Sequence, residues 1–504
     1  MLTIKIQRIR FMGIVMHQSI KNTVITYLGF GIGAINALFL YTNFLGKTHY
    51  GMVAFLLSAA NIMMPLMAFG VHNTLIRYYS KCTTEDERQK FLSFMLWMPL
   101  LLIVPITSIT YFFYDQIAFF ILQKNPTVKP FLWLVPIIGI CMGYFEVYYA
   151  WVKVHMQSVF GNFISEVLVR IVVFLMLFAV HLNWLTKDGF IYGLVFAYFL
   201  QFMAMKIYAF YVKMPVFSLS IPHNFKEIFG YSFFIILSGS VAVLLLDFDK
   251  VMIPAYENIG SNALYSVAIF IATVIAVPSR AMLQIIYPIT AKLISENKQE
   301  ELQDLYQKSA INLQVFGGFV MLGVFLNIKE IYQLIPQEYS GGILVVFLIG
   351  LSKFYDVILG NNNAIILNTK YYRWVLFFGL LLVFLIIVLN MIFIPLYGID
   401  GAALATIISV FIYNSIKLWF VVKKMDLFPF TKKTLQSLGI ITVVFVLFYF
   451  WDFHFHAIVN IILKSILISM VYIYLNYSWK ISPEINGVIH SSLKRLGVIL
   501  SKRS

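Results

Sequence analysis

Residues 371–395 read YYRWVLFFGLLLVFLIIVLNMIFIP, and residues 398–422 follow as GIDGAALATIISVFIYNSIKLWFVV. Each run is long enough to cross the hydrocarbon core of a bilayer, which takes about 20 apolar residues in a helix. Neither run alternates between apolar and polar residues, as a strand of a membrane barrel would. The two runs therefore predict two consecutive transmembrane helices.

Similar runs fill the rest of the chain, which has 504 residues, 61% of them hydrophobic and 12% charged, and a mean hydropathy of +0.86. A soluble protein has about 45–50% apolar and about 25% charged residues, so lipid is the expected solvent here. We expect an all-α polytopic membrane protein with about 14 transmembrane helices. The predicted spans are 18–46, 50–79, 90–114, 130–153, 160–183, 187–213, 227–255, 260–289, 303–327, 340–366, 371–395, 398–422, 433–453 and 456–478.

Several classes of protein are excluded by this organisation. The short connections leave almost no residues for a domain outside the membrane, which excludes a nucleic-acid enzyme and a transporter with a built-in ATPase domain. The two cysteines, Cys82 and Cys141, are too few for a secreted disulfide scaffold. The first 15 residues include basic side chains but no small-residue cleavage site, so we expect no signal peptide.

The net charge is +15, and the distribution of the basic residues along the chain predicts the orientation of the protein in the membrane. With the N-terminus inside, most lysines and arginines fall in inner segments. This asymmetry follows the positive-inside rule and predicts that both termini are cytoplasmic, with an even number of spans. The excess charge then indicates contact with the anionic lipid bilayer and no nucleic acid. The basic residues expected in outer segments are Lys47, Lys124, Lys129, Lys187 and Lys329.

An internal repeat suggests the domain organisation. NFLGKTHYGMVAF (43–55) is similar to ENIGSNALYSVAIF (257–270), and KDGFIYGLVFAYF (187–199) is similar to YGIDGAALATIIS (397–409). Both pairs are six spans apart, which predicts a parallel repeat of two six-helix lobes followed by two extra C-terminal helices. The expected domains are an N-terminal lobe at 1–215, a C-terminal lobe at 216–425, spans 13 and 14 at 426–479, and a basic cytoplasmic tail at 480–504.

The tail has one apolar face, formed by residues such as Ile485, Ile489 and Leu496, and basic residues around it. This pattern is typical of a helix on the inner leaflet, although a frayed basic tail fits the same residues.

Two motifs have structural interpretations. Gly29 and Gly33 form a GxxxG pattern, which predicts close helix packing. Asp452, His454 and His456 include metal-ligand side chains at an outer turn, but their spacing matches no known zinc pattern, so we expect no metal.

Charges inside the membrane are the main functional candidates, because each costs about 2.5–3.5 kcal/mol to insert. Some have a candidate partner within one helical turn, namely Glu166 with Arg170, Asp247 with Lys250, and Lys353 with Asp356.

Arg280 and Arg77 have no acidic residue at such a spacing, although Arg77 could extend to the interface. They lie on equivalent spans of the two repeats. Together with Arg170 they are candidates to bind a substrate diphosphate, because the planar guanidinium matches phosphate oxygens.

Glu146 lies in the fourth span beside several aromatic residues, including Tyr148 and Tyr149. A carboxylate flanked by aromatic rings is suited to contact a sugar, and Glu146 could also couple transport to protons or counter Arg170. Ordinary packing or an aromatic belt at the interface explains the rings as well.

Segments along the whole chain resemble the polysaccharide exporters of the multidrug/oligosaccharidyl-lipid/polysaccharide exporter superfamily. NFLGKTHYGMVAF is similar to the junction after the first span of that family, and YGIDGAALATIIS is similar to the entry to its twelfth span. LLLDFDKVMIPAY (244–256), with SNALYSVAIFIATV (261–274) after it, resembles the family's seventh-span pattern. Asn43 stands where the family has an arginine, and Ser261 replaces a usual glycine.

This resemblance implies a Wzx-type flippase that moves an undecaprenyl-diphosphate-linked oligosaccharide, an O-antigen or capsule repeat unit, across the bacterial inner membrane by alternating access. The diphosphate would contact Arg280, Arg77 and Arg170, and the polyprenyl tail would follow a groove built by spans 13 and 14. The implied partners, besides the lipid-linked glycan, are a glycan polymerase and export machinery. No cofactor is expected. An H⁺ or Na⁺ gradient could supply energy, with Asp247, Asp249 and Asn390 as candidate cation ligands.

Two rival functions remain open at this stage. A cation-coupled multidrug exporter of the same superfamily would favour acidic cavity residues, which Glu146 and Asp247 could supply. A membrane glycan polymerase would need catalytic residues in a large outer loop, whereas the longest predicted outer connection is only 115–129. We therefore expect a transporter and no enzyme.

Overall fold

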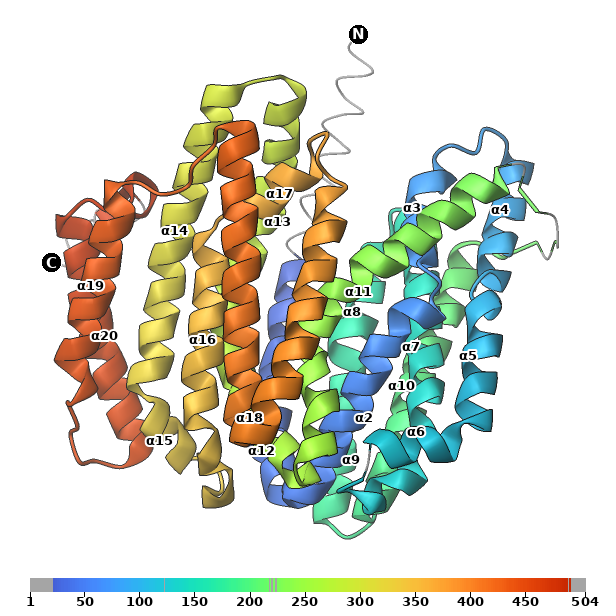
Figure 1. Ribbon diagram of the computed structural model, residues 1–504, viewed down its shortest axis with the longest axis horizontal. Helices are drawn as coiled ribbons and strands as arrows, with labels where there is room; N and C mark the ends of the chain where they lie inside the picture. The colour runs from blue at the N-terminus through green and yellow to red at the C-terminus, as the bar shows by residue number, and fades with distance from the viewer. Residues whose placement is uncertain are drawn as a thin grey trace, which may run out of the picture. The chain divides into compact units, whose positions relative to one another are not determined.

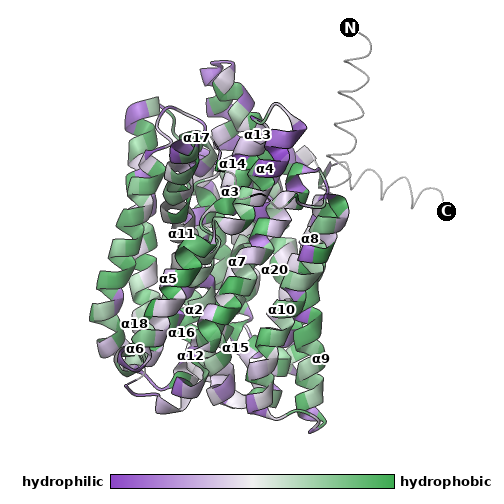
Figure 2. Cartoon of the chain, turned by 90° about the vertical axis from the view of Figure 1, so that its right-hand side faces the viewer, coloured by the Kyte–Doolittle hydropathy of each residue, from purple (hydrophilic) through white to green (hydrophobic). Residues whose placement is uncertain are grey.

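The computed structural model describes residues 21–121, 123–216, 218, 221–222, 224–487 and 489–490. These residues form helices joined by short turns, and no strand occurs among them. Along the helices hydrophobic residues predominate, whereas hydrophilic residues concentrate toward the helix ends (Figure 2). The predicted all-α membrane fold is therefore confirmed.

Within the described residues, 11 helical segments are long and apolar enough to cross a membrane. Two of them each cover two predicted spans. The segment Lys21–Tyr79 reverses direction at Gly46, which has φ 73° and ψ 171°, and the segment Trp374–Met425 is broken at Gly398, which has φ 58° and ψ −132°. Positive φ is accessible to glycine because it has no Cβ, so both turns occur where the sequence places a glycine between two apolar runs.

The helix α11 (Phe225–Tyr256) coincides with the predicted span 227–255, and the other predicted spans overlap helices. The predicted spans 260–289 and 340–366 each run across more than one helical element. The number of fourteen spans and the cytoplasmic placement of both termini stay predictions. Lys5, Arg8 and Arg10 and most of the predicted tail helix lie outside the described residues.

The chain divides into two compact units, residues 1–266 and 267–504. The first unit contains α11, which packs on α2 and α3 of the same unit. The repeat boundary expected near residue 215 stays a prediction.

The first unit begins with helical residues 21–35 and continues with η1 (Asn36–Leu45), α2 (Gly46–Met67), α3 (Val71–Tyr79), α4 (Glu85–Trp97), α5 (Leu100–Phe112), α6 (Tyr114–Ile121), η2 (Pro126–Phe131), α7 (Leu134–Val154), α8 (Ser158–Phe163), η3 (Ile164–Leu168), α9 (Val169–His181), α10 (Lys187–Val212) and α11.

The helix α12 (Ile259–Thr273) contains the boundary between the two units. The remaining elements belong to the second unit, shown in yellow-green to red in Figure 1. They are η4 (Val274–Ala276), α13 (Val277–Ser295), α14 (Gln299–Leu326), α15 (Ile328–Gln333), η5 (Gln337–Gly342), α16 (Ile343–Ile358), α17 (Asn362–Leu367), α18 (Trp374–Met425), α19 (Lys432–Tyr449) and α20 (Ala457–Ser478).

Each unit is organised around one deeply buried helix. In the first unit α7 packs against α2, α3 and α10, and Trp151 of α7 is fully buried. In the second unit α14 packs against α13, α16, α19 and α20. The hairpin of α19 and α20, which corresponds to predicted spans 13 and 14, therefore lies beside α14 (Figure 1).

Candidate functional site

Arg77 lies near the end of α3, where its side chain is exposed. Its guanidinium carbon is 4.2 Å from the ring centroid of Tyr231 on α11, close enough for a cation–π interaction. The neighbouring Tyr78 donates a hydrogen bond to Glu227 of α11 at 2.9 Å. Arg77 therefore contributes to the contact between α3 and α11. The spacing of residues along α3 could not predict this contact.

Arg170 forms the local ion pair that its sequence spacing allows. Its Nη1 lies 2.7 Å from Oε2 of Glu166, one helical turn earlier, and both side chains are about one-third exposed (36% and 30%). Gly29 and Gly33 pack against this pair, because a Cβ on Gly29 would lie 2.6 Å from Arg170 Nη1. The GxxxG pattern is thus a packing face for Arg170, and part of the charge of Arg170 is neutralised by Glu166.

Arg280 differs from these two arginines. It lies in α13 of the second unit at the end of an apolar helical segment, Ile259–Arg280, and its side chain is exposed. Among the described residues, no hydrogen bond or ion pair engages its guanidinium. Arg77 and Arg170 belong to the first unit and have different partners. A joint diphosphate site for the three arginines stays a prediction.

The aromatic residues near Glu146 are part of the core of the first unit. Tyr148 is 5% exposed and its ring lies 5.5 Å from that of Phe210, while Tyr149 is 8% exposed and packs 5.7 Å from Phe145. Their burial agrees with the packing interpretation, and a sugar-binding role for them stays a prediction.

Glu146 itself is partly buried, and it interacts electrostatically with Lys153, two turns later on α7. The ammonium of Lys153 lies 3.6 Å from the ring centroid of Tyr149. That Glu146 counters Arg170, or couples transport to protons, stays a prediction.

Asp247, a candidate cation ligand, is surrounded by donors within the first unit. Ser58 Oγ donates to Oδ1 at 2.7 Å and Asn61 Nδ2 donates to Oδ2 at 3.2 Å, while Lys250 Nζ lies 3.4 Å from Oδ1. The local pairing with Lys250 is present, but Ser58 and Asn61 come from α2. A metal cation at this carboxylate would have to displace Lys250, because the two positive charges would repel each other.

The other two candidate cation ligands are also buried. Asp249 is 2% exposed and accepts a hydrogen bond from the hydroxyl of Tyr265. Asn390 lies in α18 of the second unit and is fully buried. A cation role for the set stays a prediction.

The structure adds a buried charge that was not among the candidate site residues. Lys417 of α18 is 2% exposed, and its Nζ lies 3.4 Å from Oδ1 of Asn414. Asn414 in turn donates to Asp356 of α16 at 3.1 Å. A small cavity of about 30 Å³ adjoins Asp356 and Lys417. The sequence could have indicated this buried charge, because Lys417 lies inside the apolar run 398–422.

A buried ion pair was also missed. Lys464 of α20 and Glu330 of α15 are 5% and 6% exposed, and Nζ lies 2.9 Å from Oε1. Lys464 also donates to the carbonyl oxygen of Leu326 at 2.8 Å. The lysine interrupts the predicted span 456–478, which could have drawn attention to it. The pair ties the C-terminal hairpin to the end of α14.

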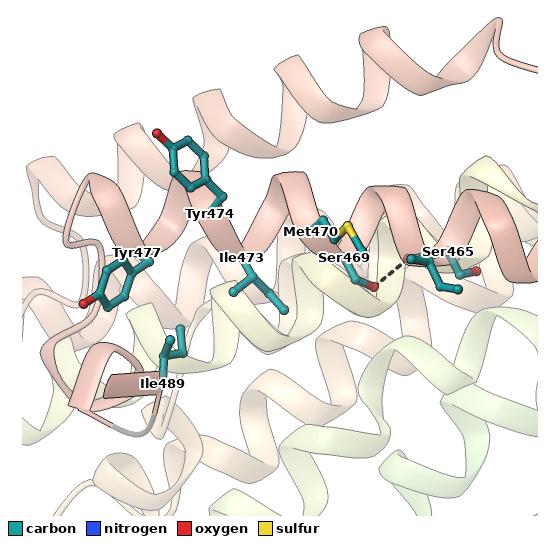
Figure 3. Close-up of a pocket in the computed structure, with 8 residues that line it drawn as sticks. Ser465, Ser469, Met470, Ile473, Tyr474, Tyr477 and Ile489 are labelled. Atoms are coloured by element: carbon teal, nitrogen blue, oxygen red, sulfur yellow. Dashed lines mark hydrogen bonds between the residues drawn. The ribbon is translucent and has the colours of Figure 1, made fainter. Parts of the chain in front are cut away.

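Apolar hollows follow α20 on the side of the short helical segment around Ile485. One has a volume of about 630 Å³, and Figure 3 shows Met470, Ile473 and Tyr474 of α20 lining it together with Ile489. An adjoining hollow of about 320 Å³ includes Phe319 of α14. Both hollows are lined by α20, and the second also by α14. A lipid groove built by spans 13 and 14 stays a prediction.

At the turn between α19 and α20, Asp452 has a structural role. Its Oδ1 accepts hydrogen bonds from the backbone N–H of His454 at 3.0 Å and from Asn460 Nδ2 at 2.6 Å. These hydrogen bonds, that of the His454 backbone first, lower the pKa of Asp452 to about 2. In the part of the chain that the structure describes, no three His, Cys, Asp or Glu side chains are grouped to hold a metal ion.

The fold is shared with solved membrane transporters. "Lipid II flippase MurJ, inward closed conformation" superposes with a TM-score of 0.73 at 17% identity, covering 92% of this chain and all of that one. An inward-facing multidrug resistance MATE family transporter of the MOP superfamily gives a TM-score of 0.61 at 13% identity, covering 80% of this chain and 94% of that one. At these identities the likeness establishes the fold.

Sequence comparison supplies the family. The polysaccharide biosynthesis protein family matches residues 15–294, which is more than half of the chain. The chain belongs to this family. A capsular polysaccharide biosynthesis protein, CapF of Staphylococcus aureus, is 23% identical over 194 residues, or 38% of this chain. That match spans 48% of CapF, about half its length.

Membership of the polysaccharide biosynthesis family confirms the resemblance to the polysaccharide exporters of the multidrug/oligosaccharidyl-lipid/polysaccharide superfamily. The protein is therefore a multi-pass membrane protein of the polysaccharide biosynthesis family, and it shares its fold with a flippase and with MATE transporters.

Proposed function

We propose that this protein translocates an undecaprenyl-diphosphate-linked oligosaccharide, a capsule or O-antigen repeat unit, from the inner to the outer leaflet of a bacterial cytoplasmic membrane. The observation that carries the proposal is Arg280, an exposed guanidinium in an apolar segment, with no hydrogen-bond or ion-pair partner among the described residues, in a chain of the polysaccharide biosynthesis family. An intramembrane charge is costly, so a ligand anion is a physical reason to retain it.

The diphosphate of the substrate would be the partner of Arg280. The planar guanidinium can donate two parallel hydrogen bonds to phosphate oxygens, and these bonds strengthen in a region of low dielectric constant. Arg77 and Arg170 belong to the first unit, and a role for either at the diphosphate stays a prediction. Glu166 neutralises part of the charge of Arg170.

The polyprenyl tail would remain in an apolar environment. The hollows along α20, with volumes of about 630 and 320 Å³, offer aliphatic and aromatic side chains for that purpose. α20, with α14 beside it, would thus help to hold the lipid while the head group crosses.

The energy would come from a gradient or from the membrane potential. A potential that is negative inside drives an anionic head group outward by about 2.3 kcal/mol per charge per 100 mV. Coupling to H⁺ or Na⁺ is a further proposal, and Asp247 with its donors is the place to test it. A glycan polymerase and export machinery would receive the product outside.

The test is outward movement of undecaprenyl-diphosphate oligosaccharide in proteoliposomes, with the Arg280→Ala and Arg280→Lys variants beside the native protein. Loss of charge-assisted hydrogen bonds worth about 1.5–3 kcal/mol should slow transport roughly tenfold to a hundredfold in Arg280→Ala. Arg280→Lys should be intermediate, because it keeps the charge but loses the fork. Arg373→Ala, which removes an exposed arginine beside Tyr372, is the matched control. Unchanged transport by Arg280→Ala would refute the role of Arg280.

A multidrug exporter is the second candidate, favoured by the structural likeness to the MATE transporter. It predicts extrusion of a cationic dye and no movement of the lipid-linked glycan. The two functions are therefore separated by supplying both substrates to the same proteoliposomes, with and without imposed ion gradients.

A further inference from the structure

A pocket unrelated to Arg280 or to the hollows along α20 opens at one end of the second unit. It lies where α13 and α18 end, where α14 begins and beyond the end of α17, and its volume is about 570 Å³. Small-molecule sites are typically about 300–1,000 Å³, so this pocket has the size of a binding site. Four lysines and one aspartate are the charged residues that line it, namely Lys298, Lys370, Lys423, Lys424 and Asp426.

The floor of this pocket is well packed. Leu293 of α13, Leu302 of α14, Ile365 of α17 and Leu427 after α18 are each less than 9% exposed, and they belong to one hydrophobic cluster. The pocket therefore has a fixed apolar base, on which the side chains of the lysines are arranged as a rim. Such a combination suits a ligand with an anionic group and an apolar part.

Three of the lysines are not committed to acidic partners among the described residues. Lys298 pairs with Glu301 at 3.0 Å and with Glu296 at 3.5 Å. By contrast, Lys370 and Lys423 have ring contacts, at 5.3 Å from Tyr371 and 4.9 Å from Trp419. Lys424 has no hydrogen-bond or ion-pair partner in the same part of the chain. The pocket thus has positive charge that the protein itself does not neutralise.

The lysines are not needed to cap α18 either. Lysines near a helix C-terminus commonly donate to its last carbonyl groups. Here Gln299 Nε2 of α14 donates to the carbonyl oxygen of Met425, the last residue of α18, at 2.6 Å. Beyond the helix, Gln303 Nε2 donates to the carbonyl oxygen of Phe428 at 2.7 Å. The ammonium groups therefore remain available for a ligand.

We propose that this pocket binds the phosphodiester head group of an anionic phospholipid from the cytoplasmic leaflet. The positive-inside rule assigns this end of the second unit to the cytoplasm. Anionic lipids give that leaflet a negative surface potential, and basic pockets between membrane helices on this side are suited to their head groups. The lysines bind the phosphate, and the apolar floor contacts the glycerol and the first acyl carbons.

The full-length protein, purified in detergent, is titrated with dioctanoyl phosphatidylglycerol, dioctanoyl phosphatidylcholine and glycerol 3-phosphate, and bound ligand is followed by native mass spectrometry. Each lysine near an anionic surface contributes roughly fivefold in affinity, so K370Q/K423Q/K424Q should weaken phosphatidylglycerol binding at least tenfold. The variant K21Q/K226Q/K432Q removes three exposed lysines outside the pocket and is the matched control. It should change the affinity less than threefold.

The proposal also requires the native protein to bind phosphatidylglycerol at least tenfold more tightly than phosphatidylcholine or glycerol 3-phosphate. Equal losses in the two triple variants would show diffuse attraction and overturn the pocket. Binding of glycerol 3-phosphate as tight as that of the lipid would show a soluble phosphate ligand and overturn the lipid. K424E supplies a second variant, and it should weaken lipid binding more than K424Q because it reverses the charge.

Discussion

Removing the ammonium of Lys464 should undock the C-terminal hairpin from α14 and α15. In the native protein Lys464 Nζ lies 2.9 Å from Glu330 Oε1 and 2.8 Å from the carbonyl oxygen of Leu326. Both charged side chains are about 95% buried, so water cannot solvate the carboxylate that Lys464→Met leaves behind. Breaking such a pair typically costs about 3–5 kcal/mol, which is the expected loss of stability.

A double-mutant cycle separates the contribution of the ion pair to stability from a change in packing alone. Replacing a buried pair by apolar residues of similar size is often neutral, so Lys464→Met/Glu330→Leu should recover most of the loss of the single variant. The exposed pair of Lys90 and Asp86, with an Nζ–Oδ2 distance of 2.6 Å, is the matched control. Lys90→Ala should cost only about 0.3–0.5 kcal/mol.

The assay is thermal unfolding in detergent together with hydrogen exchange of the amides in α15 and α20. Lys464→Met should increase exchange selectively in these two helices, because they lose their shared contact. Equal and small losses in the single and double variants, each below about 1 kcal/mol, would show that the two charges are not coupled and would refute the reasoning.

Two further predictions concern packing and pH. A Cβ on Gly29 would lie 2.5 Å from the carbonyl oxygen of Glu166. Gly29→Ala should therefore destabilise the protein by about 1–3 kcal/mol in thermal unfolding. Gly31→Ala is the control and should have little effect, because a Cβ there would have no neighbour within 4 Å. The pKa of Asp452 is about 2, below the usual value near 3.9. Its hydrogen bonds therefore stabilise the turn between α19 and α20 above about pH 4 and are lost as the pH falls toward 2. Hydrogen exchange at residues 453–455 should accelerate over that range in the native protein and should lose this pH dependence in Asp452→Asn.

The local features of this molecule could be predicted from the sequence. Apolar runs such as 371–395 determine membrane helices, because no other open structure satisfies its backbone hydrogen bonds in lipid. The pairing of Glu166 with Arg170 also followed from the sequence, since side chains four residues apart lie on the same face of a helix. The motifs along the chain were sufficient to indicate the superfamily.

Contacts between helices were decided by the tertiary structure. Glu330 lies 134 residues from Lys464, and Ser58 lies 189 residues from Asp247, so no helical spacing could pair them. Tyr148 is a buried core residue for the same reason, since the rings that cover it include Phe210 of α10. A sequence specifies which face of a helix is apolar or charged, whereas only the packing of one helix on another decides what that face contacts.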